Sequence, residues 1–436
     1  MHVLLVPVGS HGDVHPFLSL GLALKARGHQ VTLITNVHFA DMVAGAGIDF
    51  VPLGTEQMFL EATDNPRLWD PKRGLQIVIA MSARLMQPLH DLIMERYVPG
   101  QTVVAAPAHA FGARVAQEAH GVPLVTVHLQ PAAFLSAIVP PVLPIYGLMM
   151  RLPIWGRRAL YRALEVAVAG PIFGPHINPY RSRLGLPKVR RFLKWWNSST
   201  DILGLFPAWF APPQADWPPQ VTLTSFPLFD ESHQPEIDQD LQEFLDAGPP
   251  PVVFTAGSAM KHGSEFFKAA VEACVSLNRR ALLLARFPEQ VPQDLPLTVR
   301  HFSYVPFGRL LPHAAALVHH GGIGTTAQGL AAGLPQLVMP MAHDQPDNAA
   351  RLERLGVGRT LTPARFQGPA VARELSVLLT DPSYAEKARQ LSSRLDPRRA
   401  LEESCRVLEM ALDRANATPG SVLPTKNHHR PDRTFS

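Results

Sequence analysis

The feature that most constrains the fold is a buried strand that runs into a glycine-rich turn and then into a helix. Residues 314–318 form a short apolar run ending at His-His-Gly-Gly, which is typical of a buried strand that meets a tight turn. Apolar residues then recur at helical spacing up to Gly333, with Thr325 and Thr326 at the expected helix cap. A second apolar strand is expected at residues 336–340. This order predicts a parallel sheet flanked by helices.

The amino terminus repeats this organisation. Residues 3–8 predict a strand, residues 9–16 a loop, and residues 17–28 a helix that leads to a strand at 31–34. Strands and helices alternate further along the first half, and a second series begins at Val252. The chain is therefore expected to be an α/β protein with two doubly wound, Rossmann-like domains that face each other across a cleft.

The turn in the second half has the chemistry of an anion site. Gly322 and Gly324 let the backbone approach an anion closely, and the start of the helix offers unpaired N–H groups. The hydroxyls of Thr325 and Thr326 can donate hydrogen bonds to phosphate oxygens. A turn kept only for helix packing is the alternative, since many doubly wound proteins have one.

A carboxylate and an amide follow the next strand. Asp344 and Gln345 come where α/β sheets bind ligands, and both can form hydrogen bonds with sugar hydroxyls. A solvated loop would have a similar composition. Together with the glycine turn, however, the pair predicts a site for a sugar nucleotide.

These motifs resemble the donor-binding signature of the nucleotide-sugar glycosyltransferases of the GT-B type, and the resemblance extends over nearly the whole chain. It implies that Tyr304, followed by Val305, stacks on the nucleotide base. It further implies that His320 and Thr325 bind the diphosphate, and that Asp344 with Gln345 binds the sugar. Gly257 and Ser258 are expected to approach the donor phosphates from the opposite side.

One position departs from the family pattern. Gln328 stands where many UDP-sugar enzymes of this family have a glutamate that binds both ribose hydroxyls. A neutral amide holds a ribose diol less firmly, so a deoxyribose donor is favoured.

A carboxylate near the amino terminus is the candidate general base. Asp13 follows the first strand, and the family has an aspartate or a histidine at this position; the alternative is a helix-capping aspartate. His11 and His15 flank Asp13 and are minor candidates for tuning it or touching the acceptor. The expected reaction is an inverting displacement without a metal.

Three segments in the middle of the chain resemble more closely the rhamnosyltransferase family of rhamnolipid synthesis. They are residues 65–71, 205–213 and 226–230. This resemblance implies dTDP-rhamnose as donor and a dimer of 3-hydroxy fatty acids as acceptor. The alternatives are a UDP-glucose-dependent glucosyltransferase acting on sterols, polyketides or other natural products, a sugar-nucleotide epimerase or hydrolase, and a non-catalytic sugar-nucleotide sensor.

The apolar segment 134–155 is the expected wall of the acceptor channel. It contains too many prolines for a membrane-spanning helix. The side chains expected to line the channel are Ile138, Val142, Leu143, Ile145, Tyr146 and Met149. Ordinary core packing is an equal alternative. Contact of this segment with the inner surface of the cytoplasmic membrane, or with an acceptor-supplying protein, is a further hypothesis.

Composition and boundaries complete the expectations. The small net charge of +4 over 436 residues gives no indication of nucleic acid binding, and two isolated cysteines without a signal peptide favour the cytoplasm. Asp238 and Asp240 lie in an acidic stretch and are expected to be solvated, so neither metal nor cofactor is predicted. The expected domains are residues 1–229 for the acceptor and 251–416 for the donor, joined by a linker at 230–250 and followed by a disordered tail at 417–436. The family resemblance implies that the last helix packs back on the first domain.

Overall fold

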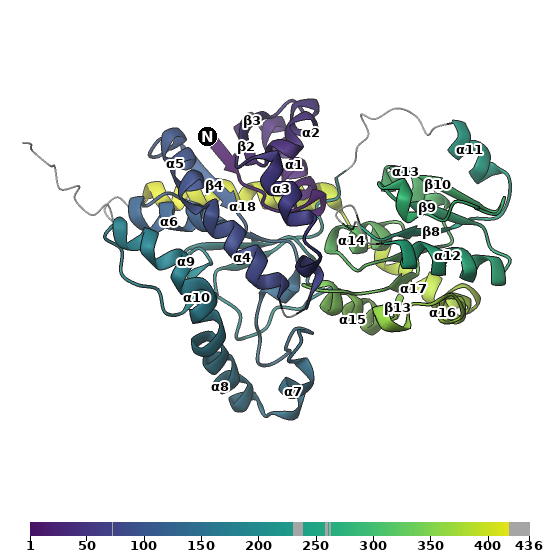
Figure 1. Cartoon of the computed structure of the whole chain (residues 1–436). Helices are drawn as coiled ribbons and strands as arrows, with labels where there is room; N and C mark the ends of the chain where they lie inside the picture. The colour runs from purple at the N-terminus through teal and green to yellow at the C-terminus, as the bar shows by residue number, and fades with distance from the viewer. Residues whose placement is uncertain (72, 230–238, 258–259, 261–262, 418–436) are drawn as a thin grey trace, which may run out of the picture.

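The computed structural model contains two parallel sheets, each covered by helices on both faces (Figure 1). It describes residues 1–71, 73–229, 239–257, 260 and 263–417. The predicted α/β class with two Rossmann-like domains is confirmed.

The first sheet has seven parallel strands in the order β3-β2-β1-β4-β5-β6-β7. The strands are β1 (His2–Leu5), β2 (Gln30–Thr35), β3 (Asp49–Pro52), β4 (Thr102–Ala106), β5 (Leu124–His128), β6 (Asp201–Gly204) and β7 (Val221–Leu223). The central strands are buried on both faces, which explains their continuous apolar runs. The helices of this half are α1 (His11–Ala26), α2 (Ala40–Gly45), α3 (Glu56–Thr63), α4 (Gly74–Arg84), α5 (Met86–Arg96), α6 (Phe111–His120), α7 (Tyr146–Arg151), α8 (Ile154–Leu164), α9 (Gly170–Arg183) and α10 (Phe192–Trp195), with one π-helical turn at Glu165–Ala169 and 3₁₀ turns at Val37–Phe39, Pro66–Trp69 and Pro131–Ala133.

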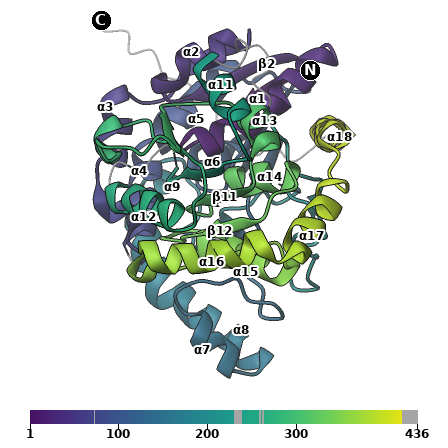
Figure 2. The same ribbon diagram turned by 90° about the vertical axis from the view of Figure 1, so that its right-hand side faces the viewer.

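The second sheet has six parallel strands in the order β10-β9-β8-β11-β12-β13. They are β8 (Val252–Thr255), β9 (Ala281–Leu284), β10 (Val299–Phe302), β11 (Ala316–His319), β12 (Gln336–Val338) and β13 (Gly358–Thr360). The helices are α11 (Gln239–Asp246), α12 (Ser264–Ser276), α13 (Phe307–Leu310), α14 (Ile323–Ala331), α15 (Gln345–Leu355), α16 (Gly368–Thr380), α17 (Pro382–Ser392) and α18 (Pro397–Ala417), with 3₁₀ turns at Pro288–Gln290, Leu311–His313 and Pro363–Arg365. Figure 2 shows α16 and α17, which contact each other, on one side of this domain.

Both helices that follow the glycine turns begin earlier than the sequence predicts. Helix α1 begins at His11, so residues 11–16 are helical rather than a loop, and Pro16 is accommodated near the helix start. Helix α14 begins at Ile323 with Gly322 as its N-cap, so Thr325 and Thr326 lie inside the first turn and do not cap it. Gly333 ends this helix with a φ of 67°, as its position predicts.

The expected linker is partly wrong. Residues 239–246 form helix α11, whose Leu241, Phe244 and Leu245 are buried in a cluster of the second domain. Asp240, Glu243 and Asp246 lie on the solvent face of this amphipathic helix. Asp240 is in its first turn, while Asp238 lies outside the described residues.

The last helix returns to the first domain. Cys405, Leu408 and Leu412 of α18 are buried in the same cluster as Leu20 and Leu24 of α1. Around this apolar contact, Glu409 accepts hydrogen bonds from Arg27, and Arg414 pairs with Asp201. The resemblance therefore gives the right position for this helix, which crosses beside α1 in Figure 1.

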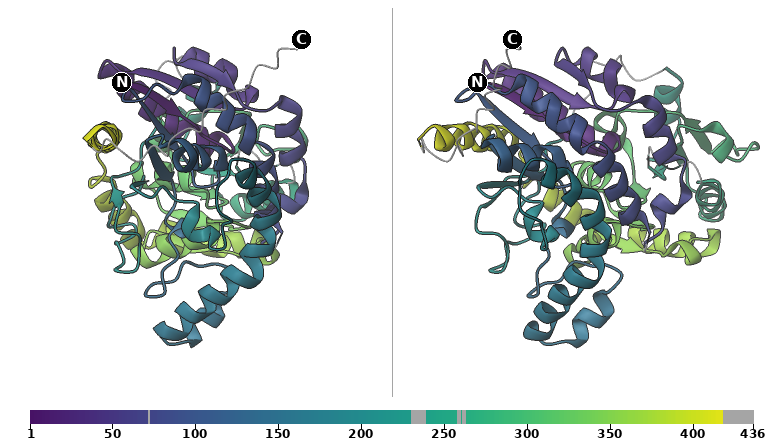
Figure 3. Two further views of the ribbon diagram at one scale, coloured as in Figure 1. Left: turned by 90° about the vertical axis from the view of Figure 1, so that its left-hand side faces the viewer. Right: turned by 60° about the vertical axis from the view of Figure 1, so that its left-hand side comes forward.

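A helical arm leaves the first domain. Figure 1 and both views of Figure 3 show α7 and α8 extending away from the two sheets. The residues before the arm, 134–145, form a loop without regular structure that runs along the cleft side of the domain.

Candidate active site

The two domains come close together where two helices begin. A Cβ atom at Gly324, in the first turn of α14, would lie only 3.8 Å from Cα of Gly12 in the first turn of α1. Each helix start follows the carboxyl end of a central strand, β11 and β1 respectively. The expected donor loop and the expected base therefore face one interdomain cleft.

Asp13 occupies the third position of α1 and points its carboxylate back to the strand–helix turn. Its Oδ2 accepts hydrogen bonds from the backbone N–H of Ser10 at 2.7 Å and from the Ser10 hydroxyl at 3.1 Å. The turn needs glycine, because a Cβ atom at Gly9, whose φ is 140°, would collide with this carboxylate. Asp13 thus has the capping contact that is the structural alternative to catalysis, but only one of its two oxygens makes it.

Burial raises the pKa of Asp13 above its ordinary value, and the Ser10 hydrogen bond and the charge of His109 partly offset this effect. A raised pKa makes the carboxylate a stronger base toward an acceptor hydroxyl. Asp13 is partly exposed as a residue, and the hydrogen bonds from Ser10 use only its Oδ2.

No sequence pattern singles out His109, which lies beside Asp13. It follows β4, the strand that pairs with β1, and its Nε2–H donates to the carbonyl of Val8 at 3.1 Å. Burial lowers the pKa of His109, while the charge of Asp13 raises it. Its position just after a buried strand is a weak signal, which the sequence shares with many loop residues.

The aromatic surroundings of Asp13 include both flanking histidines. The His11 ring packs edge-on against Phe39 at 5.0 Å between centroids, and the His15 ring stacks on Phe229 at 5.0 Å. Burial lowers the pKa of each histidine to about 4; for His11 the charge of Arg286 across the cleft adds to the effect. Both rings are therefore neutral at pH 7.

His320 lies in a narrow slot between two glycines. A Cβ atom would lie 2.8 Å from its Cε1 if placed at Gly257, and 2.5 Å from its Nε2 if placed at Gly322. Among the described residues, its buried Nδ1 has no hydrogen-bond partner. Burial lowers the pKa of His320 to about 4, so a neutral ring meets the ligand and can donate one hydrogen bond. An unpaired ring nitrogen at the start of α14 fits a diphosphate oxygen.

The neighbouring histidine has a structural role. His319 is fully buried, and its Nε2 forms a hydrogen bond with Oε1 of Gln336 at 2.9 Å while its Nδ1 accepts from the N–H of Gly321. These contacts fix the turn that carries His320.

The two threonines of the turn differ. Thr325 is partly exposed at the helix start, whereas Thr326 is completely buried. The hydroxyl of Thr326, like Nδ1 of His320, is buried and has no hydrogen-bond partner among the described residues. Ser258 lies outside the described residues.

The expected sugar-binding pair also divides into two roles. Gln345 is buried, and its Oε1 accepts hydrogen bonds from the N–H groups of Met341 and Ala342, so it shapes the loop rather than facing the sugar. Asp344 is partly exposed, and its Oδ2 accepts a hydrogen bond from Asn348 at 2.7 Å. Asn348 also donates to the carbonyl of Gly321, so it ties the sugar loop to the diphosphate turn.

Asp344 interacts electrostatically with Asp13, the candidate base. Burial raises the pKa of Asp344 to about 7, and the charges of Asp13 and Asp347 act in the same direction. The carboxyl groups of Asp13 and Asp344 therefore lie close enough for their charges to interact.

The residues predicted to contact the nucleotide base differ in exposure. Tyr304 is 53% exposed, so its ring is accessible for stacking, but the side chain of Val305 is buried in a core cluster and can offer only its backbone. Gln328 is partly exposed, and its amide lies 3.5 Å from the carbonyl of Phe229 in the first domain.

The loop expected to line the acceptor channel is joined to the donor domain. The N–H of Val142 donates to Oδ1 of Asp347 at 3.0 Å, and Oδ2 of Asp347 pairs with Arg351 at 2.7 Å. Arg351 in turn donates to the carbonyl of Phe210. This buried network joins both domains beside Asp344.

Of the expected channel residues, the structure contradicts one. The side chains of Ile138, Leu143 and Tyr146 are partly exposed and remain available, whereas Met149 is 1% exposed and belongs to the core.

Within the described residues there is no group of three or more histidine, cysteine or acidic side chains arranged to hold a metal ion. Nor is any helix in this part of the chain both long and apolar enough to span a bilayer.

Comparison with known proteins now identifies the family. Residues 3–138 match the glycosyltransferase family 28 N-terminal domain, and residues 281–402 match the C-terminal domain of erythromycin biosynthesis protein CIII-like proteins. The O-mycaminosyltylonolide 6-deoxyallosyltransferase of Streptomyces fradiae is 30% identical over 446 aligned residues, which cover 96% of this chain and all of that protein. The chain belongs to the GT-B glycosyltransferases. The predicted enzyme class and the nucleotide-sugar donor of this GT-B enzyme are thereby confirmed.

Solved structures agree with the fold of this GT-B enzyme. The glycotransferase of kitacinnamycin superimposes with a TM-score of 0.74 at 23% identity, covering 94% of this chain and 99% of that one. The spinosyn rhamnosyltransferase SpnG complexed with thymidine diphosphate gives a TM-score of 0.66 at 20% identity, covering 93% of this chain and all of the other. At these identities the likeness shows the fold alone.

Proposed function

We propose that this glycosyltransferase moves a 6-deoxyhexose, with dTDP-rhamnose as the favoured donor, to a hydroxyl of a hydrophobic acceptor with inversion at the anomeric carbon. The observation that carries the proposal is the meeting of α1 and α14, which sets the half-free carboxylate of Asp13 against the glycine turn that holds His320. A base on one wall and an anion-binding turn on the other are the two parts that glycosyl transfer needs.

In the proposed reaction, the acceptor oxygen attacks the anomeric carbon as its proton passes to the free oxygen of Asp13. The bond between the anomeric carbon and the diphosphate oxygen breaks, and the nucleoside diphosphate leaves toward the second domain. The hydrogen bond from Ser10 holds Asp13 in place, and the raised pKa lets the carboxylate take the proton.

The leaving charge would be stabilised by dipoles and neutral donors. His320 contributes a ring N–H, Thr325 a hydroxyl, and the first turn of α14 its unpaired backbone N–H groups. Gly257 lines the other side of the His320 slot. Because His320 is neutral, its contribution is a directed hydrogen bond rather than a positive charge.

Three observations support a deoxysugar attached to dTDP. Gln328 offers an amide at the position expected near the ribose, and its contact with Phe229 further reduces its availability for a diol. An apolar cavity lined by Met339, Met341 and Phe366 adjoins the sugar loop, where a C6 methyl group would be favoured over a hydroxymethyl group. The Streptomyces fradiae relative is named for a 6-deoxyallosyl transfer, and SpnG is a rhamnosyltransferase with thymidine diphosphate bound.

The acceptor we favour is lipidic, such as a dimer of 3-hydroxy fatty acids. Ile138, Leu143 and Tyr146 present partly exposed apolar surface on the loop that touches the donor domain through Val142. A UDP-glucose-dependent transfer to a sterol or polyketide would use the same wall, and it is the outcome that a donor comparison has to distinguish.

Replacement of Asp13 by asparagine tests the base. Asparagine keeps the size and can still accept the Ser10 hydrogen bond, but it cannot take a proton, so we expect kcat to fall by about 10²- to 10⁴-fold. Donor affinity, measured by calorimetry, should stay within a few-fold of the parent. Asp41→Asn, an exposed first-turn aspartate of α2, is the matched control and should leave kcat unchanged. A folded Asp13→Asn enzyme with near-parental turnover would refute the assignment.

A donor comparison tests the sugar. We expect dTDP-rhamnose to give the largest thermal stabilisation among dTDP-rhamnose, dTDP-glucose, UDP-glucose and UDP-N-acetylglucosamine at equal concentrations. Preference for UDP-glucose would overturn the deoxyribose argument built on Gln328. Release of free sugar without an acceptor, at the rate of transfer, would instead indicate a hydrolase.

A further inference from the structure

The arm formed by α7 and α8 exposes a group of large apolar side chains to solvent. Trp155 is 75% exposed, the largest value for any tryptophan described, and Leu148, Met150 and Ile154 are about half exposed. All four lie on α7 and α8, on either side of the bend at Leu152–Pro153 that joins these helices. Large apolar groups gathered at a projecting tip are unusual for a surface in contact only with water.

All the charged side chains of the arm are positive. Residues 146–164 contain four arginines and no aspartate or glutamate. Arg157 points inward and donates hydrogen bonds to the carbonyls of Met149 and Leu152 at 2.9 Å, which joins α7 to α8. Arg151, Arg158 and Arg162 are exposed, and none of the three pairs with a carboxylate in the described part of the chain. The arm therefore combines an apolar tip with uncompensated positive charge.

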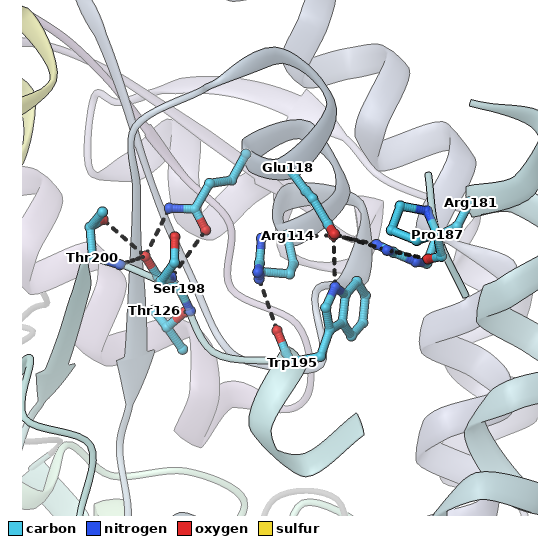
Figure 4. Close-up of polar contacts among 10 residues, drawn as sticks. Arg114, Glu118, Thr126, Arg181, Pro187, Trp195, Ser198 and Thr200 are labelled. Carbon is cyan, nitrogen blue, oxygen red and sulfur yellow. Dashed lines mark hydrogen bonds and ion pairs between the residues drawn. The ribbon is translucent and has the colours of Figure 1, made fainter. Parts of the chain in front are cut away.

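The base of the arm is held firmly. Helix α8 continues through the π-helical turn into α9, where the buried Arg181 pairs with Glu118 of α6 (Figure 4). Glu118 also accepts a hydrogen bond from Nε1 of Trp195 at 2.8 Å, and Arg114 donates to the carbonyl of Trp195. Buried contacts inside the first domain therefore hold the helix that continues from the arm.

The arm is also continuous with the cleft. Tyr146 opens α7 only four residues after Val142, whose N–H binds Asp347 of the donor domain. The intervening residues include Leu143, which the proposed function places in the acceptor wall. An apolar path therefore leads along the chain from the exposed tip toward the reacting groups.

We propose that the arm docks on an anionic lipid bilayer, with Trp155 and Ile154 inserted at the headgroup level and the arginines bound to lipid phosphates. Tryptophan favours this interface, and arginine stems lie along apolar surface while their guanidinium groups reach phosphate. A second copy of the chain fits less well, because a twofold contact through this tip would place the same unpaired arginines against each other. The proposal does not depend on the identity of the sugar or of the acceptor.

Sedimentation with vesicles tests the docking of the full-length protein. We expect binding to vesicles of phosphatidylcholine with 30% phosphatidylserine, and little binding to phosphatidylcholine alone. The Arg158→Gln/Arg162→Gln variant should bind about 25-fold more weakly, since each arginine near an anionic surface contributes about fivefold. The Ile154→Ser/Trp155→Ser variant should lose about tenfold or more.

Matched controls come from the other domain and from α18. Leu297→Ser removes an apolar side chain that is even more exposed than Trp155, and Arg398→Gln removes an exposed arginine; both should bind vesicles as the parent does. Turnover of a water-soluble acceptor should be parental in all four variants, which separates failure of docking from failure of the proposed function. Equal binding to both vesicle types, or unchanged binding by the two arm variants, would overturn the proposal. So would a parental dimer that becomes monomeric in the Ile154→Ser/Trp155→Ser variant, because the tip would then be an interface between copies.

Discussion

Replacing Asp344 by asparagine should stabilise the ligand-free enzyme at alkaline pH while weakening donor binding. Burial raises the pKa of Asp344 from 3.8 to about 7, so the folded protein keeps a proton that the unfolded chain releases. The stability due to this group is complete below about pH 3.8, falls as the pH rises, and is lost once the pH exceeds about 7. Asparagine carries no proton to lose, so the gain appears only at higher pH.

The size of the gain follows from the two pKa values. A rise from 3.8 to about 7 corresponds to a ceiling of about 4 kcal/mol. Because the side chain of Asp344 is partly exposed, we expect about half of this, about 2 kcal/mol, which is a rise in Tm of about 5 °C at pH 8. The rise at pH 5 should be clearly smaller. Asparagine can still accept the hydrogen bond from Asn348, so the loop should keep its shape.

Thermal unfolding at pH 5 and pH 8 without donor measures the effect, and Asp347→Asn is the matched control on the same helix. Asp347 forms a buried ion pair with Arg351, so its replacement leaves a buried charge unpaired and should cost about 3 kcal/mol. If Asp344→Asn lowers Tm at pH 8 as Asp347→Asn does, or raises Tm equally at both pH values, the pKa of Asp344 is not raised in the folded protein. With dTDP-rhamnose added, the parent should gain more thermal stability than Asp344→Asn.

Two further predictions concern the walls of the cleft. Gly257→Ala should weaken donor binding by about tenfold in calorimetry, because the new Cβ would lie 2.8 Å from His320 and the φ of 100° is unfavourable for alanine. Gly45→Ala, whose new Cβ meets open space, is the control and should bind the donor as the parent does. An unchanged affinity of Gly257→Ala would show that His320 does not bind the diphosphate. His109→Phe should move the acidic limb of the pH profile of kcat/KM to higher pH. The charge of His109 lowers the pKa of Asp13, so removing this charge lets the pKa of Asp13 rise further. An acidic limb that does not move would show that His109 does not influence the base.

The fold could be predicted from the sequence because strands that are buried on both faces appear there as continuous apolar runs. It also locates the site at the carboxyl ends of β1, β11 and β12, since glycine turns and polar residues directly follow these strands. Pro16 suggests a helix that begins near residue 17, yet α1 begins at His11, because a proline near a helix start sacrifices only one hydrogen bond.

The sequence does not show which side chains point into the core and which point toward the candidate site. Thr325 and Thr326 have similar chemistry, but one helical step of about 100° sends Thr326 into the core. Gln345 turns inward because two backbone N–H groups of its own loop need an acceptor. His109 reaches Asp13 only through the pairing of β1 with β4, about a hundred residues apart in the chain, and α11 hides its apolar face within an acidic segment.

The return of α18 affects the order in which the protein can be made. Cys405, Leu408 and Leu412 complete the core beside α1, yet they are synthesised after every strand of both sheets. Until they leave the ribosome, the first half of the chain keeps an apolar strip uncovered, while the second sheet already has all its strands and the helices that lie between them. The half that is made first should therefore mature last, and a nascent chain stopped before residue 397 would present this strip to chaperones.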